Sequence, residues 1–192
     1  MDVGVAALAL AAAAPVMAVV AVLVRRDLGS PVLFRQERPG RGGEVFTLVK
    51  FRSMRDAAET PGDDDAARLT RFGTALRATS LDELPTLWNV LRGDMSLVGP
   101  RPLRTHYLPL YSPRQARRHE VRPGVTGLAQ VSGRNSLDWD ERLELDVRYV
   151  ETRSFWLDLR LLARTAAVVL SGTGTAPDGA AIMPSFTGSA RV

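Results

Sequence analysis

The feature that most constrains this chain is an uncharged stretch near its start, residues 3–24, VGVAALALAAAAPVMAVVAVLV. A helix of about 20 apolar residues crosses the hydrocarbon core of a bilayer, so this stretch is long enough to enter a membrane. A cleaved signal peptide would carry positive charge ahead of its apolar run, whereas here only Asp2 and the terminal amine precede it. We therefore expect a retained, membrane-embedded helix over residues 1–26.

Two features predict how this helix lies in the membrane. Arg25 and Arg26 follow the apolar run directly, which places the rest of the chain on the cytoplasmic side by the positive-inside rule. Pro15 lies within the run and removes one backbone hydrogen bond, which kinks or breaks a helix. The pattern fits one bent span, or two half-helices that enter and leave by the same face. A buried core helix of a soluble protein is a third interpretation.

Composition limits the chemistry that remains. The chain has 192 residues, of which 45% are apolar, enough for one domain of ordinary size plus an appendage. With no cysteine, disulfides and thiolate metal sites are excluded, so a bound metal would be a hard cation such as Mg²⁺ on carboxylate oxygens. All basic residues except Lys50 are arginine, whose planar fork suits phosphate, although a GC-rich genome would produce the same bias.

The basic residues occur in two blocks. Residues 35–55 carry a net charge of +4 and residues 101–122 a net charge of +5. Acidic stretches at 56–65 and 138–151 offset them, and aromatic residues make up only 6% of the chain. A nucleic-acid surface needs a broad positive face with interleaved aromatic residues, so we expect no nucleic-acid partner.

The first half of the chain after the membrane helix contains strand and helix patterns. The runs VLFRQ and VFTLVKF (residues 32–36 and 45–51) are separated by the cluster PGRGG, which predicts a β-hairpin. An acidic, non-periodic exposed loop is expected over 56–67. Helical spacing follows over 69–76 and 85–91.

The second half is predicted to be helical. Trp139, Leu143, Val147 and Val150 recur at steps of four and three, which predicts an amphipathic helix with an acidic outer face. Residues 155–170 form a second helical pattern with basic residues along one side, typical of core packing or of a helix in the lipid headgroup plane. Residues 172–192 lack periodicity and are expected to form a flexible tail.

Two adjacent carboxylates, Asp82 and Glu83, lie in the segment TSLDELPTLW (residues 79–88). One interpretation is a capping box, in which Ser80 caps a helix and Glu83 bonds back to it. Pro85 argues against that, because proline suits the first helical position and not the fifth. We therefore expect the helix to begin at Pro85, with both carboxylates just outside its N-terminus, where backbone amides favour anions.

Two turn-rich segments follow, GDMSLVGPRPL (93–103) and RPGVTGLAQVSGRN (122–135). Each is consistent with a plain loop, and each is also consistent with a backbone that comes close to a ligand. Together with a membrane segment, a carboxylate pair and arginine-bearing loops on both sides, they indicate chemistry on a phosphate beside lipid.

These motifs resemble the bacterial sugar transferases, the monotopic phosphoglycosyl transferases. The resemblance covers residues 2–170 in family order and includes PVLFRQERPGRGGEVFTLVKFRSM, TRFGTALRATSLDELPTLWNVLRGDMSLVGPRPL and the 122–135 segment, followed by ELDVRYVE and LDLRLL. The length is similar to that of the small form of the family. The implied fold is α+β and mainly helical, with a re-entrant, Pro-broken membrane helix (1–26), a short β-hairpin and amphipathic interfacial helices around one small catalytic domain (27–171).

The resemblance also implies an activity. Members transfer a phosphosugar from a nucleotide diphosphate sugar, usually a UDP-sugar, to polyprenyl (undecaprenyl) phosphate and release the nucleoside monophosphate, a first membrane step of surface glycan synthesis. Asp82 matches the family nucleophile, which forms a covalent aspartyl-phosphosugar intermediate. Glu83 matches its partner in the dyad. Both are expected to bind Mg²⁺ at the cytoplasmic face of the bacterial plasma membrane.

Other residues are carried over by position. Arg77, Arg101 and Arg134 match family arginines that contact phosphate or nucleotide sugar, and Lys50 and Arg52 are further candidates for substrate binding. The family's Ser-Pro break is Ala14-Pro15 here, and basic residues ahead of the helix are missing, yet the re-entrant form remains our expectation. Homo-oligomers are possible. The competing hypothesis is a non-catalytic membrane scaffold of a glycan-assembly complex that retains the fold.

Overall fold

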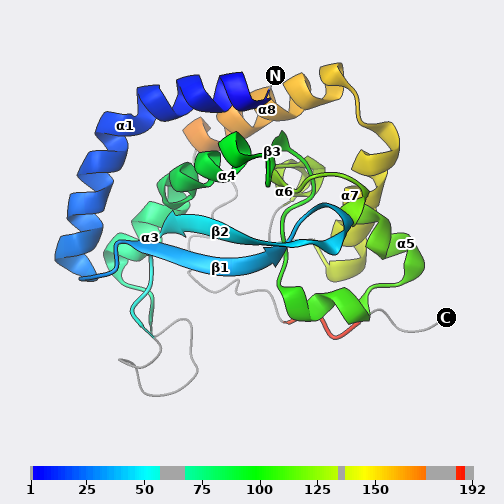
Figure 1. Ribbon diagram of the computed structural model, residues 1–192, viewed down its shortest axis with the longest axis horizontal. Coiled ribbons are helices and arrows are strands. Elements are labelled where there is room, and N and C mark those ends of the chain that lie inside the picture. The colour runs from blue at the N-terminus through cyan, green and yellow to red at the C-terminus, as the bar shows by residue number, and fades with distance from the viewer. Residues whose placement is uncertain (1, 57–67, 134–136, 172–184, 189–192) are drawn as a thin grey trace.

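The computed structural model describes residues 2–56, 68–133, 137–171 and 185–188, except for the side chains of residues 170 and 171 (Figure 1). The helices and strands are α1 (Asp2–Asp27), β1 (Leu33–Pro39), η1 (Arg41–Gly43), β2 (Val45–Phe51), α3 (Arg71–Ala78), η3 (Leu81–Thr86), α4 (Leu87–Arg92), β3 (Ser96–Val98), η4 (Thr105–Leu110), α5 (Pro113–Ala116), η5 (Arg117–Glu120), β4 (Gly124–Thr126), α6 (Leu128–Ser132), α7 (Trp139–Thr152) and α8 (Phe155–Ser171).

Helix α1 changes direction along its length: its first part runs beside α8, and its second part descends towards the β-hairpin (Figure 1). Pro15 lies inside the helix and lacks the amide hydrogen that an unbroken helix needs. It is the one helix in the described part of the chain that is long and apolar enough to cross a membrane, with a mean hydropathy of 2.6. The predicted apolar N-terminal helix is therefore confirmed.

Both ends of α1 are attached to the rest of the chain. Near the start, the Ser96 hydroxyl donates a hydrogen bond to Asp2, and Ala6 is fully buried in the main core. Near the end, Val24 packs in a cluster with Phe51 and Leu76. Between these anchors several apolar side chains are exposed, namely Leu8, Val16, Val19, Val22 and Leu23, although Val20 is buried. These exposed side chains in the middle of α1 can therefore contact a surface outside this chain.

The predicted β-hairpin is confirmed. β1 and β2 pair antiparallel, with Phe34 opposite Lys50 and Pro39 opposite Val45, and the PGRGG cluster forms the connection. Gly42 and Gly43 both take positive φ there, the backbone conformation for which glycine carries no steric cost. The strand pair projects Lys50 from β2 towards the residues that follow α3.

A second, parallel pair, β3 with β4, was not predicted, because both strands lie in the segments that we expected to be turns. The glycines of those segments allow two backbones to pack together: a Cβ at Gly124 would overlap the backbone of Gly99, and one at Gly127 would overlap the Gly99 carbonyl. These glycines therefore allow close backbone-to-backbone packing between the two segments.

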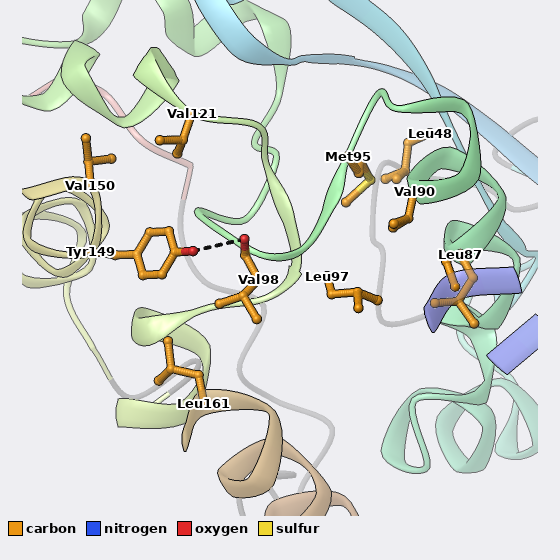
Figure 2. Close-up of a cluster of buried hydrophobic side chains, with 11 residues drawn as sticks. Leu48, Leu87, Val90, Met95, Leu97, Val98, Val121, Tyr149, Val150 and Leu161 are labelled. Atoms are coloured by element: carbon orange, nitrogen blue, oxygen red, sulfur yellow. Dashed lines mark hydrogen bonds between the residues drawn. The ribbon is translucent and has the colours of Figure 1, made fainter. Parts of the chain in front are cut away.

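The main core lies between β3 and the helices around it. Figure 2 shows Leu97 and Val98 of β3 among buried side chains from α4, α7 and α8, with the Tyr149 hydroxyl donating to the Val98 carbonyl at 3.2 Å. Leu143, Val147 and Val150 of α7 are buried, which confirms the predicted amphipathic helix. The predicted helix over residues 155–170 is also confirmed, as α8.

Part of the C-terminal segment is packed against the domain. Phe186 is only 4% exposed and lies against the rings of Tyr107, Tyr111 and Trp139. Its amide donates to the Tyr107 hydroxyl at 3.3 Å. Most of the tail that we predicted to be flexible lies outside the described residues, but burial of Phe186 shows that the described portion contributes to the core.

Asn89 joins the hairpin to α4. Its side chain is 1% exposed; Nδ2 donates to the Thr47 carbonyl at 2.7 Å, and Oδ1 accepts from the Val49 amide at 3.1 Å. Both partners lie on β2, so this one amide group fixes the strand that carries Lys50 against the helix that follows the carboxylate pair.

We expect Asn89→Leu to lower the free energy of unfolding by about 2–4 kcal/mol, because it leaves buried β2 backbone groups without partners. For a chain of this size the melting temperature should fall by roughly 5–15 °C, measured by thermal unfolding in detergent micelles. Arg92→Leu, at a largely exposed position of the same helix, serves as the control. An unchanged melting temperature for Asn89→Leu would contradict this role.

Candidate active site

The carboxylate pair lies within the tight helical turn η3 and not ahead of a helix. The turn starts from Ser80, which takes a left-handed conformation (φ 57°, ψ 15°), and the Glu83 amide donates to the Ser80 carbonyl at 3.1 Å. The prediction that the helix begins at Pro85 is wrong: Pro85 lies inside η3, and α4 begins at Leu87. A turn with three residues per revolution accommodates this proline with the loss of one backbone bond.

The capping-box interpretation is also excluded by geometry. The Ser80 side chain accepts no hydrogen bond at the start of η3. A left-handed φ at a non-glycine residue costs about 1–2 kcal/mol, and such strain is typical of functional sites. Its effect here is to turn the chain sharply out of α3, so that Asp82 and Glu83 face inward from the next turn.

Glu83 is held by two cations. Lys50 Nζ lies 2.6 Å and Arg101 Nη2 lies 2.8 Å from the same oxygen, Glu83 Oε1. Burial alone would raise the pKa of Glu83, but Arg101 and Lys50, through their charges and hydrogen bonds, hold that pKa well below its usual range. Glu83 is therefore ionised at any physiological pH. Its two ion pairs hold β2, which carries Lys50, and the loop after β3, which carries Arg101, next to the carboxylate pair.

Asp82 differs from Glu83 both in its hydrogen bonding and in the direction of its pKa shift. It is 8% exposed, and within the described residues its carboxylate accepts no hydrogen bond. Burial and the neighbouring Glu83 charge raise the pKa of Asp82 to about 6, although Lys50, Arg101 and Arg77 oppose the shift. At neutral pH it is mostly an ionised carboxylate that accepts no hydrogen bond from the described residues, which suits a nucleophile.

Both carboxylates line a cavity of about 510 Å³, within the range of small-molecule sites. The cations Lys50, Arg77 and Arg101 line it together with the two carboxylates. Residues of α6, α7 and α8 complete the lining. A smaller cavity of about 70 Å³ is also lined by Lys50, Glu83 and Arg101, and includes Arg38.

The structure brings most of the predicted site residues together. Arg77 lies on α3, is exposed, and lines the cavity with its Nη1 3.6 Å from Met54 Sδ. Arg52 does not line the cavity; it is 7% exposed, and its Nη1 donates to the Ser30 carbonyl at 3.1 Å. Arg134, the remaining arginine that we predicted, lies outside the described residues.

Sequence reasoning missed a buried ion pair, Arg118 with Asp146, whose two residues also line the cavity. Arg118 Nη2 lies 2.6 Å from Asp146 Oδ2, the side chains are 1% and 3% exposed, and the same Nη2 donates to the Arg101 carbonyl at 2.6 Å. The pair therefore fixes the backbone of the residue that binds Glu83. A signal was present, because Asp146 is a carboxylate within the otherwise apolar stripe of the helix that begins at Trp139.

The described residues contain no group of three or more ligating side chains that would form a metal site by themselves. Mg²⁺ is commonly held by one or two carboxylates together with water and substrate phosphates. The Asp82 carboxylate and Glu83 Oε2 fit that arrangement, since neither accepts a hydrogen bond from a described residue, whereas Glu83 Oε1 is occupied by two cations.

Comparison with known proteins identifies the family. The profile of the bacterial sugar transferase family matches residues 1–172. The uncharacterized sugar transferase EpsL of Bacillus subtilis (strain 168) is 52% identical over 88% of this chain and 85% of its own length. The UDP-glucose:undecaprenyl-phosphate glucose-1-phosphate transferase of Caulobacter vibrioides is 44% identical over 89% of this chain and 68% of its own length.

Several relatives are much longer. The undecaprenyl-phosphate galactose phosphotransferase of Salmonella typhimurium is 41% identical over 84% of this chain, but the match spans only 38% of that protein. The family profile itself covers the dyad, the hairpin and the membrane helix, all of which lie within residues 1–172. This chain therefore belongs to the bacterial sugar transferase family, which confirms the resemblance drawn from its motifs and the prediction that it is a phosphoglycosyl transferase.

Proposed function

We propose that this enzyme transfers a sugar 1-phosphate from a UDP-sugar to polyprenyl phosphate, as a first membrane step of surface glycan synthesis. Relatives that share its catalytic region carry names for this reaction with glucose, galactose or N-acetylgalactosamine. The observation that carries the proposal is the asymmetry of the dyad: Glu83 is held by two cations, while the adjacent buried carboxylate of Asp82 is unbonded among the described residues and lines a ligand-sized cavity.

In the first step, an Asp82 carboxylate oxygen attacks the phosphorus attached to the sugar. A bond forms between that oxygen and phosphorus, and the bond from phosphorus to the bridging oxygen breaks, so UMP leaves with the electron pair. Lys50, Arg77 and Arg101 line the same cavity and offset the repulsion between the carboxylate and an anionic phosphate. Glu83 acts as the residue that positions two of these cations.

In the second step, a phosphate oxygen of the acceptor attacks the phosphorus of the aspartyl intermediate. The new diphosphate bond forms as the bond to Asp82 breaks, which restores the free carboxylate. Asp82 and Glu83 Oε2 would hold Mg²⁺, which when bound adds positive charge near the phosphate oxygens. The first step replaces a phosphoanhydride bond with the mixed anhydride bond of an acyl phosphate, and the second forms a phosphoanhydride again, so no external oxidant is needed; both attacking oxygens are anionic, so no general base is needed.

The anchoring of α1 supports a re-entrant helix with both ends on the cytoplasmic side. Asp2 and Ala6 at one end, and Val24 at the other, contact the same domain, whereas the apolar middle is exposed. A straight helix of 26 residues would be about 39 Å long and would carry its two ends to opposite faces of a bilayer. The bend that accompanies Pro15 brings both ends back to one domain.

Cysteine labelling tests this topology. The chain contains no cysteine, so Asp2→Cys introduces a single reactive thiol. We expect a membrane-impermeant maleimide to label it in inverted vesicles and not in intact spheroplasts. Asp56→Cys, on the exposed surface after β2, is the cytoplasmic control. Labelling of residue 2 from outside intact cells would show a full span.

The reaction is tested with purified enzyme, Mg²⁺, undecaprenyl phosphate and a panel of UDP-sugars, by measuring UMP release. At least one donor should give UMP and a lipid-linked phosphosugar. Asp82→Asn should remove the covalent adduct seen by intact-protein mass spectrometry and lower turnover at least about a thousandfold. Glu120→Gln is the control at a surface carboxylate. Normal turnover by Asp82→Asn would overturn the mechanism, and no release with any donor would revive a non-catalytic role.

The raised pKa of Asp82 also predicts a pH-dependent cost in stability. A carboxyl whose folded pKa, about 6, exceeds its unfolded value of 3.8 binds protons more tightly when folded, so stability falls as pH rises between these values. Asp82→Asn removes this loss. Without ligands, the melting temperature of Asp82→Asn should exceed that of wild type at pH 7.5. This corresponds to a free energy of unfolding that is higher by about 1–3 kcal/mol, and the difference should shrink towards pH 4.5. An equal difference at both pH values would contradict the burial effect.

A further inference from the structure

The lining of the active-site cavity includes apolar side chains as well as Asp82, Glu83 and the cations around them. Five of the apolar residues belong to β4, α6 and α8, namely Val125, Ala129, Val131, Val168 and Val169. Polar side chains of the same region, Thr126, Gln130, Arg142, Asp146 and Thr165, also line the cavity. A nucleotide sugar is polar over most of its length, so its chemistry does not require the apolar residues.

The packing of α8 explains why these valines face the cavity. Leu161 is 1% exposed in the main core, and Thr165 Oγ1 lies 2.6 Å from Thr126 Oγ1 on β4. Residues three and four positions apart share a helix face, so the next turn after Thr165 presents Val168 and Val169 on the same side. The contact with β4 therefore directs the apolar end of α8 into the cavity that contains the dyad.

The same helix connects this cavity to the membrane side of the protein. α8 runs beside the first part of α1, and Leu161 shares a core cluster with Ala6 of α1 (Figure 1). At the start of α8, Phe155 and Trp156 are 53% and 70% exposed. Val169 is itself 39% exposed, so the cavity wall opens to the surface at this helix.

We propose that the wall formed by α6 and α8 binds the first isoprene units of the acceptor, with the acceptor phosphate directed towards Asp82. This assignment rests on the proposed function. An acceptor with a charged head and a hydrocarbon chain matches a cavity whose lining includes both charged and apolar side chains, and its long chain needs a path from the buried dyad to lipid. The donor then lies with its phosphates among Lys50, Arg77 and Arg101.

Binding of the donor and binding of the acceptor can be tested separately, because each half-reaction uses only one of the two substrates. In the first, enzyme and UDP-sugar without acceptor give UMP and the Asp82 adduct. In the second, added undecaprenyl phosphate removes the phosphosugar from Asp82. We expect Val169→Glu to leave the first half-reaction within about twofold of wild type and to slow the second by about 10- to 200-fold, the range for a polar group in an apolar subsite.

Matched variants control for lost folding or membrane attachment. Ala163→Glu places the same charge at an exposed position of α8 that does not line the cavity, and Val169→Leu keeps the wall apolar; both should transfer normally. Equal slowing of both half-reactions by Val169→Glu would assign this wall to the nucleobase and overturn the proposal, as would unchanged transfer. A wild-type enzyme that forms no adduct would instead refute the proposed function.

A measurement on the unaltered enzyme complements the variants. A short prenyl phosphate with a diazirine on its second isoprene unit should cross-link to residues of α6 and α8, mapped by peptide mass spectrometry, and excess undecaprenyl phosphate should suppress the cross-links. Labels confined to α1, or suppressed only by the UDP-sugar, would contradict the assignment.

Discussion

The active site depends on the ion pair network of Glu83. Lys50 reaches it from the hairpin and Arg101 from the loop after β3, so one oxygen joins segments that are far apart in the sequence. Because Glu83 is only 21% exposed, these contacts are screened less than surface pairs would be. Removing either cation would leave a poorly solvated carboxylate and a displaced segment. The network thus has two consequences. It holds the hairpin and the loop after β3 together at the site, and it concentrates positive charge beside Asp82.

Further buried contacts hold Lys50 and Arg101 in position around Glu83. Asn89 fixes β2 through two backbone groups, and the Arg118–Asp146 pair holds the Arg101 carbonyl. Arg118 is nearly inaccessible to solvent, so breaking that pair would leave a buried charge uncompensated, at a cost of about 3–5 kcal/mol. The part of the cavity around Glu83 is therefore held rigid by buried polar groups, whereas the apolar clusters set the positions of the helices.

The sequence was sufficient for features that arise from local patterns. The hairpin, α7, α8 and the apolar N-terminal helix were predicted because each has a periodicity or turn composition of its own. The parallel pair β3–β4 could not be predicted, since each strand has only three residues and the pairing joins segments far apart in the chain. The start of α4 was misplaced for a different reason: Pro85 excludes an α-helical interior position, but the chain adopts η3 instead. Glu83's partners, Lys50 and Arg101, were named separately from motifs, and only the fold shows that they share one oxygen.

The arrangement of charge in the dyad also explains why two carboxylates can lie side by side in a buried site. Two adjacent anions repel, and the pKa of one must rise unless counter-charge is supplied. Here the counter-charge is distributed unequally: both close cations contact Glu83, and Asp82 carries the remaining penalty as a raised pKa. A desolvated carboxylate that accepts no hydrogen bond, as is the case for Asp82 among the described residues, is a better nucleophile than one held in salt bridges, because no hydrogen bonds have to break before it attacks. The stability lost at Asp82 is thus the physical counterpart of the reactivity that the proposed transfer requires.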